Sequence, residues 1–186
     1  WSSDVCSSDL LSISGWAQVS KNVSLLSHIP YGSYTTDPMG YVGAGVEYAI
    51  IGHYFGTTIL SLANPAVPVV VQEIPNITPD LWHEVDVYQH YAYVSTEATD
   101  GLRIIDLSGL PGQCAYKDTV LAGMTKAHTL MVSGDRLYVF GGIIDNFGAT
   151  VFSLADPWRP VRIGADTTYY VHDAYVRHDT CYMANI

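Results

Sequence analysis

The stretch WHEVDVYQHYAYVS, residues 82–95, decides the fold, because its pattern recurs in three other places along the chain. It contains two short runs, HEVDVYQ and YAYVSTE, in which apolar and polar residues alternate as they do in β-strands. The segments that align with it are MGYVGAGVEYAIIG from Met39, AHTLMVSGDRLYVF from Ala127 and VHDAYVRHDTCYMA from Val171. This self-similarity predicts a protein built from tandem repeats.

A histidine marks the same place in three of the four segments. His83, His128 and His172 each precede a tyrosine by ten positions, and the spacings between these histidines are 45 and 44 residues. The tyrosines are Tyr93, Tyr138 and Tyr182. In the first segment the alignment places Gly40 where the histidine would stand, 43 residues before His83. The even spacing sets the repeat length at about 44 residues.

A second landmark follows each of the first three segments. The strings TTILSLANPAVPVVV, GLRIIDLSGLPG and ATVFSLADPWRPVRIG each indicate a strand followed by a turn. Their matching apolar residues are Ile59, Ile104 and Val151. Each unit therefore holds four short β-rich runs; in the second unit the third run is LRIIDLS and the fourth, weaker one lies before Thr125. No segment has the pattern of an amphipathic helix.

Four strands in every unit are typical of the blades of a β-propeller. We therefore expect an all-β fold, an incomplete β-propeller with about three complete four-stranded blades and partial blades. The expected units are close to residues 38–80, 81–125, 126–169 and 170–186. A β-sandwich also has short strands, but it has no reason to repeat at a fixed interval.

The two ends of the chain point to a truncated reading frame. Residues 1–10, WSSDVCSSDL, resemble the translation of a common sequencing adapter, so we expect them to be non-native and assign residues 11–186 to the propeller. The chain has no initiator Met and stops at Ile186 within a strand pattern. We therefore expect that an export signal and any anchoring segment of the parent protein lie outside this sequence.

Composition excludes some classes of partner. The chain is 48% hydrophobic and 14% charged, with a formal net charge of -10, which is typical of a globular protein and disfavours nucleic acid as a ligand. No run of eighteen apolar residues occurs, so we expect no transmembrane segment.

The order of these motifs resembles that of a known family. WHEVDVYQHYAYVSTEATDGLRIIDLS and SLADPWRPV are similar to the LVIVD repeat, and the run from Asn22 to Ile186 resembles the choice-of-anchor B family of bacterial surface proteins. NVSLLSHI, EYAIIGHYFGTTILSLANPAVPV, KAHTLMV and YVHDAYV also match. The resemblance implies a secreted or surface-displayed propeller; it does not bring a known reaction with it.

The repeated histidines are candidate metal ligands. In a propeller the first strand of each blade is innermost, so equivalent residues at the starts of these strands converge near the central channel. Neutral imidazoles are common ligands of divalent transition metals, and three of them leave an open coordination position. The candidates are His83, His128 and His172. The alternative is that each ring only makes a hydrogen bond to the neighbouring blade.

Four carboxylates are candidate ligand-binding residues near the same channel. Glu84 and Asp173 adjoin the histidines and can orient their rings or bind the ligand, although strand alternation points them to the opposite face. Glu97 and Asp145 lie in loops between second and third strands, which open at the same end of a propeller. We expect Trp82 and Trp158 to pack between blades.

Three functional classes stay open after the sequence. The first, which we favour, is an extracellular or cell-surface interaction scaffold with a protein or carbohydrate ligand at the propeller face. The second is a metal-dependent enzyme or metal-binding propeller that uses the three histidines, and the third is a propeller that binds carbohydrate or another small ligand. The sequence contains no G-x-S-x-G, H-E-x-x-H or C-x-x-C motif. Catalytic residues and enzymatic activity therefore stay unassigned.

Overall fold

The computed structural model describes residues 22–178 and 180–185, so the interpretation of residues 1–10 lies outside the described residues. The described part consists of β-strands with two single-turn 3₁₀ helices and contains no α-helix. The predicted all-β fold is therefore confirmed. None of the helical turns in this part of the chain has the length and apolar character needed to cross a membrane.

The first eight strands form two four-stranded antiparallel sheets, each with its strands in chain order. The first sheet contains β1 (Thr35–Gly43), β2 (Val46–His53), β3 (Gly56–Ser61) and β4 (Val69–Pro75). The second sheet contains β5 (Val85–Tyr88), β6 (Tyr91–Val94), β7 (Leu102–Asp106) and β8 (Ala115–Thr119). The weak fourth run expected before Thr125 is thus β8.

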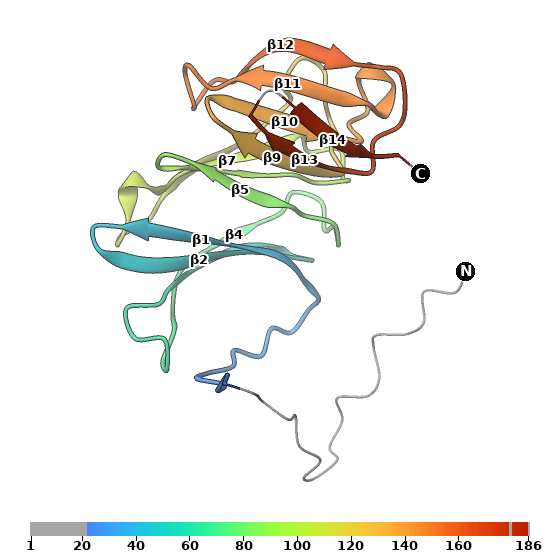
Figure 1. The fold of residues 1–186 in the computed structure, drawn as a ribbon. Helices are drawn as coiled ribbons and strands as arrows, with labels where there is room; N and C mark the ends of the chain where they lie inside the picture. Colours follow the sequence, from blue (N-terminus) through green and yellow to red (C-terminus); the bar gives the residue numbers. More distant parts are fainter. Residues whose placement is uncertain (1–21, 179, 186) are drawn as a thin grey trace.

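The remaining strands repeat this arrangement once and then begin it again. The third sheet contains β9 (Thr129–Ser133), β10 (Arg136–Phe140), β11 (Ala149–Ser153) and β12 (Val161–Asp166). β13 (Asp173–Arg177) and β14 (Thr180–Ala184) form a hairpin. The four-stranded units predicted from the repeat are present, and Figure 1 shows the three four-stranded sheets following one another in chain order, from blue through green to orange.

Apolar faces of successive sheets pack on one another and form the core. β7 belongs to the second sheet, which packs on the first sheet through one face and on the third sheet through the other. Leu102, Ile104 and Ile105 of β7 are therefore all fully buried. β7 thus carries apolar side chains on both of its faces, Leu102 and Ile104 on one and Ile105 on the other. Each such side chain contributes about 1.5–3 kcal/mol by leaving water. Three apolar clusters join the four units, and they are centred on Ile50 with Val85, on Tyr93 with Leu137, and on Phe140 with Val176.

Carboxylates tie the first strands of successive sheets together. The Val85 N–H donates to Oδ2 of Asp37 at 3.0 Å, and the Val132 N–H donates to Oδ2 of Asp86 at 2.6 Å. β1 contacts β5, β5 contacts β9, and β9 contacts β13. The starts of the four first strands are therefore held side by side, and these starts carry the candidate site.

Strand register corrects the alignment of the first unit. Ile50 pairs with Ile59 just as Tyr93 pairs with Ile104, so Ile50 and Tyr93 are equivalent. Their partners in the first strands are Met39 and Asp86, and His83 lies three residues before Asp86. The residue equivalent to the histidines is therefore Thr36, and the placement of Gly40 there was wrong. The β1–β2 hairpin extends further than the β5–β6 hairpin, which displaced the sequence alignment.

Candidate functional site

A cleft with a volume of about 640 Å³ opens where the first strands begin. We call it the first-strand cleft. It receives residues from β1 and from the segments directly before β5, β9 and β13. It is lined by Thr36, Asp37, Pro38, Leu81, Trp82, His83, Glu84, His128 and His172. The three histidines and the threonine at the equivalent position thus all reach one cavity.

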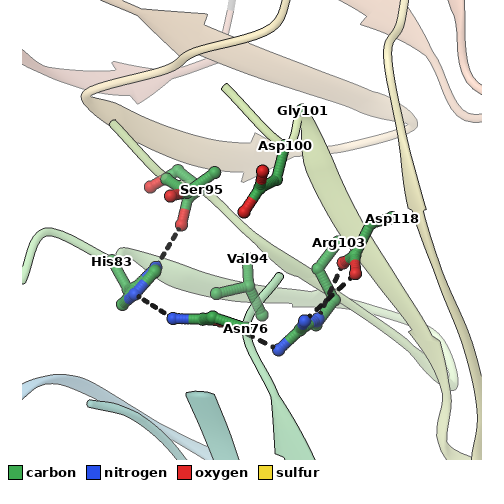
Figure 2. A pocket seen from close by; sticks show the side chains of 9 residues that line it. Asn76, His83, Val94, Ser95, Asp100, Gly101, Arg103 and Asp118 are labelled. Atoms are coloured by element: carbon green, nitrogen blue, oxygen red, sulfur yellow. Dashed lines mark hydrogen bonds and ion pairs between the residues drawn. The ribbon is translucent and has the colours of Figure 1, made fainter. Parts of the chain in front are cut away.

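His83 is held by the protein through both of its ring nitrogens. Its Nδ1 lies 2.7 Å from the carbonyl oxygen of Ser95 and therefore carries the proton of that hydrogen bond. Its Nε2 lies 3.0 Å from Nδ2 of Asn76, and the amide is oriented because its Oδ1 accepts from Arg103 at 3.2 Å (Figure 2). Nε2 also lies 3.0 Å from the carbonyl oxygen of Asp80. The side chain is only 4% exposed.

These contacts give His83 a structural role. A ring whose two nitrogens are both engaged has no lone pair free for a metal. The small cavity beside it, shown in Figure 2, has a volume of about 10 Å³, room for about one water molecule and no larger ligand. The hydrogen-bonding alternative that the sequence left open describes this histidine.

His128 and His172 form a pair that His83 does not join. Their Nε2 atoms lie 3.1 Å apart, and their ring centroids are 4.4 Å apart. On the other side of the first ring, Nδ1 of His128 lies 2.5 Å from Oε1 of Glu97. Because a carboxylate accepts hydrogen bonds, Nδ1 carries a proton and Nε2 of His128 presents its lone pair to His172. Glu97, one of the four candidate ligand-binding carboxylates, thus contacts His128.

Asp80 fixes the loop that carries Trp82 to the loop that carries Glu97. Its Oδ2 accepts from the Thr96 hydroxyl at 2.8 Å and from the Glu97 N–H at 2.6 Å. Its Oδ1 accepts from the Trp82 N–H at 3.4 Å. Burial acts to raise the pKa of Asp80, but these hydrogen bonds, with one from the Ala98 N–H, outweigh it and lower the pKa below its ordinary value.

Trp82 lies on the wall of the first-strand cleft with 54% of its surface exposed. Its ring centroid is 6.4 Å from that of His128. The sequence expectation that it packs between sheets was wrong, because Trp82 precedes β5 and lies outside the sheet interface. Trp158 does follow the expectation, since it packs against the core cluster between the second and third sheets. The centroid of its ring lies 5.9 Å from that of Tyr91.

The cleft is acidic. Asp37 and Glu84 both line it. The sequence pattern had placed Glu84 on the face opposite His83. Glu84 precedes β5, however, so strand alternation does not apply to it. Burial raises the pKa of Glu84, and the charges of Asp37 and Asp173 raise it further. Burial also raises the pKa of Asp37, against the lowering effect of the Val85 N–H.

The other two carboxylates are engaged locally. Asp145 forms a two-point ion pair with Arg162, with distances of 2.6 and 3.0 Å, and also accepts from the Thr150 hydroxyl at 2.8 Å. Oδ1 of Asp173 accepts from the Ala174 N–H at 2.7 Å. Neither residue lines the first-strand cleft. The ion pair with Arg162 lowers the pKa of Asp145. Both oxygens of this carboxylate thus already accept hydrogen bonds from the protein itself.

The metal site expected from three histidines is not assembled in this form. In the residues that the structure describes, no three side chains among His, Cys, Asp and Glu come together as a set that can hold a metal ion. The physical reason is the engagement of His83 with Ser95 and Asn76. Sequence reasoning missed Thr36 and Trp82; the signal for Trp82 was its place directly before a repeated histidine.

Comparison with known proteins gives a partial likeness to a solved structure. No known family model matches the chain, and no curated protein sequence matches it. Among solved structures, the GH43_1 enzyme from Xanthomonas citri is similar over 71% of this chain, with 16% identity and a TM-score of 0.46. The match covers 56% of that protein, so this chain spans about half its length.

Proposed function

We propose that the sheets are consecutive blades of a β-propeller and that its first-strand cleft binds a small, hydroxyl-rich ligand, a carbohydrate. The chain-order sheets and the contacts between their first strands support the propeller arrangement. The cleft and its exposed tryptophan support the ligand class. The single observation that carries the proposal is Trp82, which stands 54% exposed on the wall of an acidic cleft of about 640 Å³.

The shape of the cleft favours a small ligand over a protein surface. Small-molecule sites are concave and have volumes of roughly 300–1,000 Å³, whereas protein interfaces are broad surfaces that bury about 800 Å² on each partner. A cavity of about 640 Å³ falls within the first range. For this reason we place a carbohydrate before a protein among the partners that the sequence left open.

The chemistry of the lining matches a sugar. The flat face of an indole packs against the apolar C–H face of a pyranose, while carboxylate and imidazole groups accept hydrogen bonds from its hydroxyls. Trp82 supplies the indole face, and Asp37 and Glu84 supply hydrogen-bond acceptors in the same cleft. A net charge of -10 disfavours anionic sugars, so we expect neutral or amino sugars.

The test is binding of a panel of soluble neutral and amino oligosaccharides, measured by calorimetry in the presence of a chelator. We expect at least one oligosaccharide to bind, with affinity falling about tenfold or more in Trp82→Ala, since covering a large apolar side chain contributes about 1.5–3 kcal/mol. Phe55→Ala is the matched control, because Phe55 is 55% exposed and lies outside the cleft. Absence of binding across the panel, or equal binding by Trp82→Ala, would overturn the proposal.

We also propose that the protein acts outside the cell, as the resemblance to choice-of-anchor B proteins implies. The experiment is recovery of the complete reading frame, followed by cell fractionation of its source organism. An export signal and a surface-exposed product would support the proposal. A complete frame without a signal, and a product retained inside the cell, would overturn it.

A further inference from the structure

His128 and His172 point their Nε2 atoms at each other across 3.1 Å at the edge of the first-strand cleft. We propose that these two nitrogens bind one divalent transition metal ion of the kind that imidazole prefers, such as zinc or copper. This inference goes beyond the proposed function, because it does not require an organic ligand. It also differs from the three-histidine site expected from the repeat, because His83 takes no part.

The separation of the two nitrogens suits a shared ion. With metal–nitrogen bonds of about 2.0–2.1 Å, nitrogens 3.1 Å apart subtend an angle of about 95–102° at the metal. This angle lies between the ideal octahedral and tetrahedral values, so the distance between the two nitrogens does not have to change. Without a metal, one proton on His172 can bridge the pair, and the ion replaces that proton.

Glu97 prepares His128 for this role. A metal-binding histidine commonly donates its second ring N–H to a carboxylate, which fixes the tautomer and the ring orientation. Oε1 of Glu97 lies 2.5 Å from Nδ1 of His128, so the proton is on Nδ1 and the lone pair of Nε2 faces the proposed ion. The Glu97 backbone is itself held by Asp80 through the 2.6 Å hydrogen bond to its N–H.

The surroundings leave space for the rest of the coordination shell. His128 and His172 both line the first-strand cleft, which is large enough for additional ligands. Water or the hydroxyls of a bound ligand can fill the positions that the protein does not supply, and the carboxylate of Glu84 lines the same cleft. Two protein ligands and an accessible cleft describe an open metal site, not a closed structural one.

The first experiment is titration of the whole chain with zinc chloride by isothermal calorimetry. We expect one ion per chain for the wild type and for His90→Gln, a control whose histidine lies in the β5–β6 turn. We expect His128→Gln and His172→Gln to lose this binding, with circular dichroism confirming their fold. Unchanged zinc binding in both variants, or no zinc binding by the wild type, would overturn the proposal.

A second measurement does not depend on any variant folding correctly. The electron paramagnetic resonance spectrum of the wild-type chain with one equivalent of Cu²⁺ should show superhyperfine splitting from two imidazole nitrogens. A spectrum without two nitrogen ligands would exclude the pair as the site. Because the oligosaccharide titrations are made in a chelator, failure of metal binding leaves their outcome unaffected, and the two proposals can fail separately.

Glu97 has its own test as a positioning residue. Replacing a carboxylate that orients a metal-binding histidine weakens metal affinity about 10- to 100-fold. We therefore expect Glu97→Gln to weaken zinc binding by this factor while the stoichiometry stays at one ion. Zinc affinity equal to that of the wild type would remove Glu97 from the site.

Discussion

Arg103 and Asp118 face each other across β7 and β8 as a two-point ion pair, with distances of 2.8 Å from Nε to Oδ1 and 3.1 Å from Nη2 to Oδ2. The same guanidinium reaches the first sheet, where the carbonyl oxygens of Ile74 and Pro75 accept from it at 3.1 and 2.7 Å. Arg103 is 5% exposed. One buried side chain therefore joins the second sheet to the first, next to the loop that positions His83 (Figure 2).

We expect Arg103→Ala to lower the free energy of unfolding by about 3–5 kcal/mol, because it leaves the partly buried Asp118 and the carbonyl oxygens of Ile74 and Pro75 without their buried partner. Urea denaturation measures the change. Arg162→Ala is the control, since the Arg162 side chain is 40% exposed and loss of its ion pair with Asp145 should cost less. Equal losses of stability in the two variants would show that Arg103 does not join the second sheet to the first.

The repeat made the strands predictable, because alternating side chains and turn residues are local properties of the sequence. Tyr93, Ile104 and their equivalents fall in second and third strands as expected. The start of the first unit was misplaced because hairpin length is set by pairing between β1 and β2, which the histidine spacing does not reveal. The sequence alignment therefore could not identify Thr36 as the counterpart of His83.

The candidate site was less predictable than the fold. Histidine spacing brought three rings to one end of the sheets, but it said nothing about their partners. His83 is engaged by Asn76 from the first sheet's exit loop, and His128 by Glu97 from the β6–β7 loop. Both contacts depend on loop conformations fixed by tertiary hydrogen bonds, above all those of Asp80.

The contacts of His83 predict a structural role that can be measured. His83→Phe keeps the ring shape but leaves the Ser95 carbonyl and the Asn76 amide without their partner. Each unsatisfied buried group costs about 1–3 kcal/mol, so we expect the free energy of unfolding to fall by about 2 kcal/mol or more. Zinc stoichiometry should stay unchanged in the folded variant. Loss of zinc binding with normal stability would reverse this assignment.

The lowered pKa of Asp80 predicts a particular dependence of stability on pH. A carboxyl whose pKa is lower in the folded state stabilises the fold above its ordinary value of 3.8, and this contribution is lost as pH falls through the folded-state pKa. We expect Asp80→Asn to be less stable than the wild type at pH 7. Chemical denaturation should show the difference shrinking below about pH 4.

Asp86 provides a control of opposite sign. Burial raises its pKa, so its contribution is present below the ordinary value of 3.8 and is lost as pH rises through the folded-state pKa. Relative to the wild type, Asp86→Asn should therefore become more stable as pH rises from 3 to 7. Parallel pH profiles for the two variants would show that local charge does not govern either effect.

Two glycines with the same positive φ allow the effect of backbone strain to be separated from contact with His128 of the proposed metal site. Gly134 and Gly141 both have φ of +61°, a region that costs an L-residue about 1–2 kcal/mol. A Cβ at Gly134 meets nothing within 4 Å, whereas at Gly141 it would lie 2.8 Å from Cβ of His128 and 3.2 Å from the Val171 carbonyl oxygen.

We therefore expect Gly134→Ala and Gly141→Ala both to lose about 1–2 kcal/mol of stability in urea denaturation from backbone strain, with a further loss in Gly141→Ala from the clash. Only Gly141→Ala should also weaken zinc binding, because relief of the clash displaces His128 from its position beside His172. Gly134→Ala should bind zinc as the wild type does. If Gly141→Ala lost stability but kept full zinc affinity, the position of the His128 ring would not control the metal site.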